Sequence, residues 1–213
     1  YPLRRQRQMC IRDRFKYTDQ MNSNYKVIKF KSNESKEVND LVSIEEPLEI
    51  ILKYKDKENW VDNTVSITMR TPGDDEDLVT GFLFNEKIIE KIEYIEKIES
   101  TGKPTDQYGI KNKITITINN SKNIDIDKIK RNFLTNSSCG VCGKTSLDSL
   151  EIIKKDKILK SIPKITKEII MSSPDKLRKN QSEFSKTGGI HASGLFTSQG
   201  DIVAIREDVG RHN

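Results

Sequence analysis

Apolar residues alternate with polar ones at a strict two-residue period, and this alternation constrains the fold more than any other feature. Residues 113–118 read Lys-Ile-Thr-Ile-Thr-Ile, and residues 64–69 follow the same period. Successive side chains of a β-strand point to opposite faces of a sheet, so this period predicts strands with one buried face. Apolar residues also recur through residues 26–30 and 38–54, which we expect to be strands.

A helix start follows the alternating segment 64–69. Four acidic residues, 74–77, precede Leu78, Val79, Phe82 and Leu83, which recur at helical spacing. Negative charge is favoured at a helix N-terminus, so we interpret the acidic cluster as helix capping. The alternative is a carboxylate metal site, but nothing nearby supplies the spacing of a calcium-binding loop.

Apolar spacing and turn signals predict the remaining elements. They are a strand or helix at 92–98, helices at 125–133 and 144–153, and strands at 195–197 and 202–205, separated by a turn at 198–201. A further helix is expected to begin at Ser173, because serine can cap it and Pro174 fits its first turn. The fold class is therefore α/β, of the mixed α+β kind.

Composition indicates a globular chain with an unusual beginning. Apolar residues make up 34% of the 213 residues, and no apolar run approaches the ~20 residues of a membrane span. The first 14 residues hold five arginines and one aspartate, a net +4 of the total charge of +5. We interpret residues 1–20 as a non-native or disordered basic segment and Met21 as the native start. A basic arm that binds nucleic acid is the alternative.

The rest of the chain divides at the polar break near residue 136. We expect an N-terminal α/β domain at 24–135 and a second domain at 137–213. The chain stops inside a dense polar motif, which indicates a fragment that lacks its C-terminal part. No secretory leader is recognisable, so we expect a cytoplasmic protein with no nucleic-acid or membrane partner.

The cysteine pair in Ser138-Cys139-Gly140-Val141-Cys142-Gly143 carries the most chemical information. Outside residues 1–20 these are the only cysteines, far fewer than a secreted disulfide scaffold uses. The pair fits thiol redox cycling, since a helix expected just downstream would lower the thiol pKa. It also fits sulfur transfer, in which an exposed thiolate on a flexible glycine loop carries a persulfide. The pattern alone does not choose between the two.

Zinc is the third possibility for this pair. Cys139 and Cys142 have the spacing of zinc ligands, and His191 and His212 would complete a four-ligand site. The two histidines are 21 positions apart, whereas structural zinc sites use closely spaced pairs. A zinc deaminase is excluded, because its His-x-Glu sequence is absent and the order of its motifs is reversed.

Three segments in order resemble the FdhD family, the sulfur-carrier accessory proteins of formate dehydrogenase. The first is Thr71 to Leu83, and the second is Ser137 to Gly143. The third combines Thr187 to Ser193 with Glu207 to Asn213. The resemblance covers the chain from about residue 26 to its end. It implies a cytidine-deaminase-like fold for the second domain, truncated at its C-terminal end. The arginine-rich start has no counterpart in the family.

The resemblance also implies a function. FdhD-like proteins accept persulfide sulfur from a cysteine desulfurase and pass it to the molybdenum cofactor, in its bis-molybdopterin guanine dinucleotide form. The cofactor is then inserted into formate dehydrogenase. The resemblance makes Cys139 the persulfide residue and Cys142 an auxiliary thiol. It implies a sulfurtransferase-type carrier without a tightly bound metal, and a homodimer is compatible with it.

The third motif supplies the expected site residues. His191 is expected to orient a group near Cys139 or to stabilise its thiolate. Gly188 and Gly189 would let the backbone approach an anionic ligand, although an ordinary tight turn explains them equally well. Arg211 suits a bidentate phosphate contact, and Glu207 or Asp208 would fix Arg211 or a ribose hydroxyl. The full set expected to bind the cofactor is Thr187, Gly188, Gly189, Glu207, Asp208, Gly210, Arg211 and His212.

Overall fold

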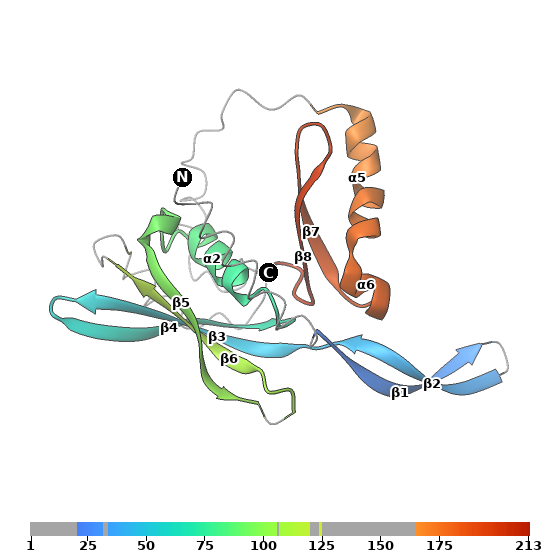
Figure 1. The fold of residues 1–213 in the computed structure, drawn as a ribbon, viewed down its shortest axis with the longest axis horizontal. Coiled ribbons are helices and arrows are strands. Elements are labelled where there is room, and N and C mark those ends of the chain that lie inside the picture. The colour runs from blue at the N-terminus through green and yellow to red at the C-terminus, as the bar shows by residue number, and fades with distance from the viewer. Residues whose placement is uncertain (1–20, 32–33, 106, 120–123, 125–164) are drawn as a thin grey trace, which may run out of the picture.

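The computed structural model describes residues 21–31, 34–105, 107–119, 124 and 165–213. Its largest element is a four-stranded sheet in the order β4-β3-β6-β5 (Figure 1). The strands are β3 (Glu46–Asp56), β4 (Asn59–Arg70), β5 (Ile95–Pro104) and β6 (Lys111–Ile118). The central pair β3 and β6 is parallel, and the two outer pairs are antiparallel.

The predicted alternation of β6 is confirmed. Ile114, Ile116 and Ile118 are at most 1% exposed, whereas Thr115 and Thr117 lie on the opposite, half-buried face. Helix α2 (Asp75–Asn85) lies over the apolar face of the sheet and contributes Val79 and Leu83 to the core (Figure 1). The helical spacing read from the sequence thus corresponds to the face that packs on the sheet.

Two antiparallel strands, β1 (Asn22–Lys31) and β2 (Glu34–Ser43), form an arm that projects from the sheet (Figure 1). The prediction of one strand over residues 38–54 is wrong, because the chain breaks between β2 and β3. Ile44 turns inward there, is 5% exposed, and donates its N–H to the Met21 carbonyl at 2.8 Å. The sequence does mark this break, because Glu45, Glu46 and Pro47 interrupt the apolar pattern between Ile44 and Leu48.

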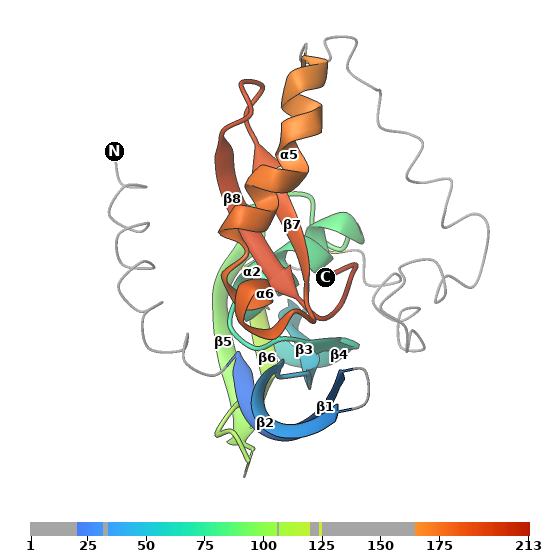
Figure 2. The ribbon, with the colours of Figure 1, turned by 90° about the vertical axis from the view of Figure 1, so that its right-hand side faces the viewer.

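The C-terminal part consists of α5 (Lys167–Asn180), α6 (Ser182–Thr187) and the antiparallel hairpin β7 (His191–Phe196) and β8 (Ile202–Asp208). Figure 2 shows α5 lying along this hairpin. Lys176 donates to the Gly200 carbonyl at 2.6 Å and fixes α5 to the turn of the hairpin. The two predicted strands and the turn between them are confirmed, although both strands are longer than predicted.

The predicted helix start at Ser173 is wrong. Helix α5 begins at Lys167, after Thr166, and Pro174 lies inside it. Ser172 and Ser173 do not cap the helix but donate their hydroxyls to the Ile169 carbonyl at 3.1 and 2.7 Å. Such bonds to the preceding turn are typical of serine inside a helix. Proline removes a single N–H, and the helix continues past it.

Residues 92–98 contain both elements that the sequence allowed, a 3₁₀ turn η3 (Ile92–Tyr94) followed by the first residues of β5. The predicted helices at 125–133 and 144–153 lie outside the described residues, as does the boundary near residue 136. The division into two domains therefore stays a prediction. None of the helices in the described ranges is both long and apolar enough to cross a membrane.

Candidate ligand-binding cavity

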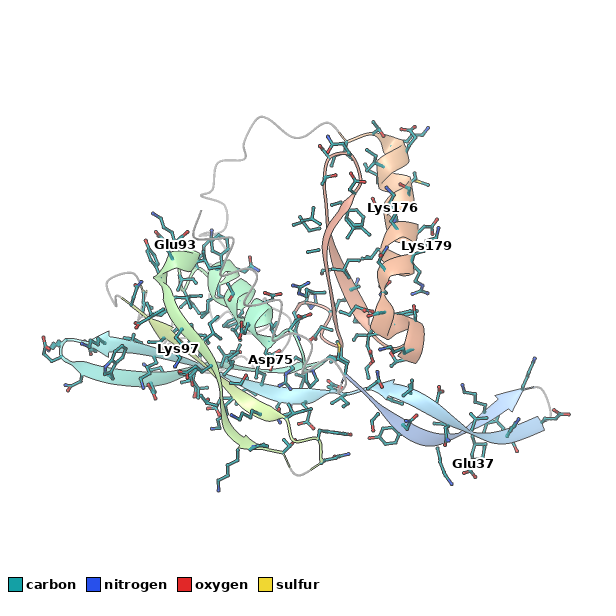
Figure 3. All side chains as sticks on the ribbon, in the orientation of Figure 1. Glu37, Asp75, Glu93, Lys97, Lys176 and Lys179 are labelled. Carbon is teal, nitrogen blue, oxygen red and sulfur yellow. The ribbon has the colours of Figure 1, made fainter. Side chains whose placement is uncertain are left out.

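A cavity of about 370 Å³ lies where the start of α2, strand β4 and the β7–β8 hairpin meet. Its walls come from Ile50 and from residues within the segments 66–86, 191–193 and 206–213. Figure 3 shows Asp75 at this junction, at the beginning of α2 above the sheet. The cavity thus brings together two segments that are more than a hundred positions apart in the sequence and that carry two of the three recognised motifs.

The acidic start of α2 is bound by Arg70, a buried arginine at the end of β4. Arg70 is fully buried, and its Nε and Nη2 atoms donate to the two oxygens of Asp75 at 2.9 and 3.0 Å. Its remaining N–H groups face the carbonyls of Glu46, Pro47 and Lys111 and the Asn112 side chain. A bidentate pair of this kind is strong and directional. It fixes the first turn of α2 to the sheet.

A second arginine reaches the same turn from the hairpin. Arg206 on β8 donates through Nε and Nη2 to Asp77, with the Nε distance at 2.7 Å, and its Nε lies 3.3 Å from Asp74. Burial lowers the pKa of Arg206, but Asp77 and Asp74 together raise it above its ordinary value. The three carboxylates do begin the helix as predicted, yet Asp74 makes no side-chain cap, and all three bind arginine instead.

Asp208 connects the end of β8 to the segment before α2. Its Oδ2 accepts the Thr71 N–H at 3.0 Å, and its Oδ1 accepts the Gly210 N–H and the Asn213 amide, both at 2.6 Å. In return, the Thr71 hydroxyl accepts the Val209 N–H at 3.2 Å. Burial raises the pKa of Asp208, while these donors act in the opposite direction. The carboxylate is therefore held by groups on both sides of the junction.

The turn after Asp208 is tightly packed on itself. A Cβ at Gly210 would collide with the Asn213 amide and would lie 2.9 Å from the Asp208 Oδ1, so a larger residue would displace these side chains. Asn213 also donates to the Met69 carbonyl at 2.8 Å and thereby reaches β4. Arg211 and His212, between these two residues, are exposed and line the cavity. Their side chains make no hydrogen bond or ion pair within the described part of the chain.

Glu207 has contacts other than those we predicted for it. Its carboxylate accepts the Glu183 and Phe184 N–H groups at 2.9 and 2.8 Å, at the N-terminus of α6. The first N–H groups of a helix lack partners within the helix, so Glu207 serves as a cap supplied by another strand. It lines the cavity, but neither Arg211 nor any other cation pairs with it among the described residues.

A model of the FdhD/NarQ family matches residues 43–213. The chain belongs to this family. The matched residues include β3 to β6, both described segments of the cavity wall and the cysteine pair, so the resemblance inferred from the three motifs is confirmed. Cys139 and Cys142 themselves lie outside the described residues, and their roles stay predictions.

Several members of the FdhD/NarQ family resemble this chain over most of its length. The sulfur carrier protein FdhD of Picrophilus torridus is 46% identical over 176 residues, which cover 83% of this chain and 61% of that protein. The protein of the same name from Sulfolobus acidocaldarius is 38% identical over 188 residues, covering 88% of this chain and 64% of that protein. The chain thus spans less than two thirds of either relative.

The fold of the family is also found in a solved structure. A protein from Desulfotalea psychrophila, assigned as a formate dehydrogenase accessory protein, superimposes with a TM-score of 0.59 over 90% of this chain and 65% of that protein. The two sequences are 18% identical, so the likeness concerns the fold. It supports the mixed α/β class predicted from the sequence.

The structure separates the nine described site residues of this FdhD/NarQ-family chain into two groups. Those that line the cavity are His191, Glu207, Asp208, Gly210, Arg211 and His212. His191 is exposed there and is not a core histidine. The other three, Thr187, Gly188 and Gly189, lie at the end of α6, outside the cavity lining. The Thr187 hydroxyl accepts from Ser43 at 2.9 Å and donates to the Glu183 carbonyl at 3.0 Å.

Sequence reasoning missed Arg70 and Arg206 as partners of the acidic cluster. A signal was available, because the chain uses lysine for most of its positive charge. Only five arginines follow residue 14, and three of them, Arg70, Arg206 and Arg211, lie at this junction. Arginine offers a planar fork that matches carboxylate geometry, which lysine does not. In a lysine-rich chain, an isolated arginine is therefore a useful pointer to a specific pairing.

Proposed function

We propose that this chain is a sulfur carrier that serves the maturation of the molybdenum cofactor for formate dehydrogenase. The observation that carries the proposal is the cavity, which joins two of the three family motifs around exposed cationic and imidazole groups. The names of the relatives, sulfur carrier protein FdhD, support the same function. The expected location is the cytoplasm, where the desulfurase and the apo-dehydrogenase would be its partners.

The substrate in this proposal is the bis-molybdopterin guanine dinucleotide form of the cofactor. Arg211 is the group that best fits a phosphate of this substrate, since it is exposed at the cavity and bound to no carboxylate among the described residues. Three acidic residues of the wall are neutralised by arginine, which weakens their repulsion of a phosphate. Asp74, Asp75 and Asp77 are paired with Arg70 or Arg206.

The sulfur chemistry is assigned to Cys139. Its thiolate would attack the terminal sulfur of a persulfide on the desulfurase, so that a new S–S bond forms and the desulfurase thiolate leaves. Cys142 would act as an auxiliary thiol, and His191 on the cavity wall would orient or stabilise the reacting sulfur. This scheme makes the chain a sulfurtransferase-type carrier rather than a dithiol oxidoreductase, which needs both cysteines.

The test is an intact mass measurement under non-reducing conditions after incubation with a cysteine desulfurase and cysteine. We expect the protein and Cys142→Ala to gain the mass of one sulfur atom, and Cys139→Ala to gain none. A loss of two hydrogens without a sulfur gain would indicate a thiol oxidoreductase. A stoichiometric, thiol-bound zinc would indicate the zinc-binding alternative, in which His191 and His212 are the candidate partners of the cysteines. Either result would overturn the proposal.

A further inference from the structure

Strand β8 directs alternate side chains to two different partners. Glu207 points to α6 and caps its N-terminus, whereas Arg206 binds Asp77 in the first turn of α2 and Asp208 binds Thr71 just before that helix. This division follows from the two-residue period of a strand. Arg206 holds the acidic first turn of α2, and Asp208 holds Thr71. Arg206 and Asp208, two positions apart on the same face of β8, thus attach the end of the hairpin to the other side of the cavity.

The contacts of Asp208 differ from those expected of a ligand-binding group. Both of its oxygens already accept N–H groups of the protein, from Thr71 on one side and from Gly210 and Asn213 on the other. These donors surround the short turn that presents Arg211 and His212 to the cavity. These contacts let Asp208 determine where the Arg211 and His212 side chains stand.

We propose that Asp208 is a positioning residue, which clasps residues 209–213 to Thr71 and so holds Arg211 and His212 at the cavity. Thr71 is the second half of the clasp, since its N–H donates to Asp208 and its hydroxyl accepts from Val209. The structural part of this inference stands on these contacts alone. Its consequence for ligand affinity rests on the proposed function.

The structural part can be tested without a ligand. In Asp208→Asn one carboxylate oxygen becomes an NH₂ group, so at least one of the surrounding N–H donors loses its acceptor. The loss of one such bond should speed amide hydrogen exchange at Val209 and Gly210 by about tenfold or more. The matched control is Asp201→Asn in the exposed turn of the same hairpin, which should change neither rate.

The two histidines give an independent readout of the same change. The chain has only His191 and His212, and both line the cavity. Their imidazole signals in an NMR spectrum are therefore few and assignable. We expect the His212 signal to move or broaden in Asp208→Asn and to stay unchanged in Asp201→Asn. Unaltered exchange rates together with an unaltered His212 signal would overturn the inference, whatever the chain binds.

The consequence for binding is tested with guanosine diphosphate, which carries the guanine and diphosphate of the proposed substrate. We expect Asp208→Asn and Arg211→Ala each to raise the Kd about tenfold, and the double variant to be no weaker than Arg211→Ala alone. Fully additive losses would mean that Asp208 does not act through Arg211 and would overturn this consequence. If the unaltered chain bound no guanosine diphosphate, the phosphate role proposed for Arg211 would fail. The hydrogen-exchange result would still show whether Asp208 holds residues 209–213 to Thr71.

A second pair of variants guards against misfolding of Asp208→Asn. Thr71→Val removes the hydroxyl that accepts the Val209 N–H but leaves the Thr71 N–H in place. We expect it to loosen residues 209–213 in the same way, and Thr71→Ser to restore them because it keeps the hydroxyl. Equal behaviour of the valine and serine variants would contradict the second half of the clasp.

Discussion

The two glycines after α6 differ in backbone φ angle, and this angle determines which of them must be glycine. Gly188 ends the helix in the left-handed region, with φ at +68°, and donates its N–H to the Phe184 carbonyl at 2.8 Å. Gly189 has no such angle. A Cβ on Gly188 would meet open space, and one on Gly189 would lie 4.0 Å from the Thr187 carbonyl oxygen, an ordinary contact. The glycine at 188 is therefore required by conformation as a helix C-cap, and not by a crowded surrounding.

These two positions give a matched prediction. Gly188→Ala should lower the free energy of unfolding by about 1 kcal/mol, because alanine is strained in the left-handed region. Gly189→Ala should leave it within about 0.5 kcal/mol of the unaltered value, since this backbone suits alanine. Urea unfolding monitored by circular dichroism measures both. Equal losses at the two positions would show that backbone angle is not what selects glycine here.

The elements of the sheet are joined by polar contacts on the face turned away from α2. Glu49 on β3 is paired in register with Lys113 on β6, and their side chains form an ion pair at 2.6 Å. Thr64 on β4 donates to the other oxygen of Glu49 at 2.8 Å. One carboxylate thus links three neighbouring strands. The bonds from Lys113 and Thr64 hold the pKa of Glu49 below its ordinary value.

A lowered pKa in the folded chain predicts how stability depends on pH. The unfolded chain binds a proton at Glu49 more readily, so the contribution of Glu49 is present above about pH 4.3 and is lost as the pH falls further. Glu49→Gln should therefore lower the free energy of unfolding at pH 7, by up to about 1 kcal/mol for a pair this exposed. The difference should be smaller at about pH 3 than at pH 7.

Urea unfolding at both pH values is the measurement. Glu99→Gln is the control, because Glu99 pairs with Lys97 of the same strand and both side chains are well exposed. It should change little at either pH. A Glu49→Gln effect of the same size at pH 3 and pH 7 would mean that the carboxylate charge is not what stabilises the three strands.

At the scale of the whole molecule, residues 70–77 are where the sheet, α2 and the C-terminal hairpin meet. Within this segment, the buried Arg70 at the end of β4 binds Asp75. Arg206 of the hairpin binds Asp77. Asp208 adds the bond to Thr71 between them. The position of the cavity therefore depends on contacts between segments that are about 130 positions apart in the sequence.

Arg70 is the group whose loss should affect the molecule most. Arg70→Met would leave the Asp75 carboxylate, which is 16% exposed, without its cation and should cost about 3–5 kcal/mol of unfolding free energy. Lys97→Met is the control from a well-exposed pair and should cost less than about 1 kcal/mol. Thermal and urea unfolding of the two variants measure this difference. Similar losses would contradict the central place given to Arg70.

Local patterns allowed a good part of this fold to be predicted from the sequence. The alternation at 113–118 and the helical spacing from Leu78 to Leu83 gave β6 and α2, because the period of burial is set by local backbone geometry. The alternation at 64–69 gave the strand β4 but not its buried face, since Val65 is buried while Ile67 and Met69 are 53% and 39% exposed. The break at Ile44 and the start of α5 were missed. Glu45, Glu46 and Pro47 do mark the first. The second was missed because Pro174 lies inside α5 and not in its first turn.

The sequence by itself determined the family, through three ordered motifs, and the helix α2 that carries most of the first of them. Only the tertiary structure decided the partners of the polar residues: that Glu207 caps α6, that the acidic start of α2 binds Arg70 and Arg206, and that Asp208 clasps Thr71. The physical reason is that periodicity reports which face of an element is buried. A hydrogen bond or ion pair depends on where two distant segments meet, which no local period records.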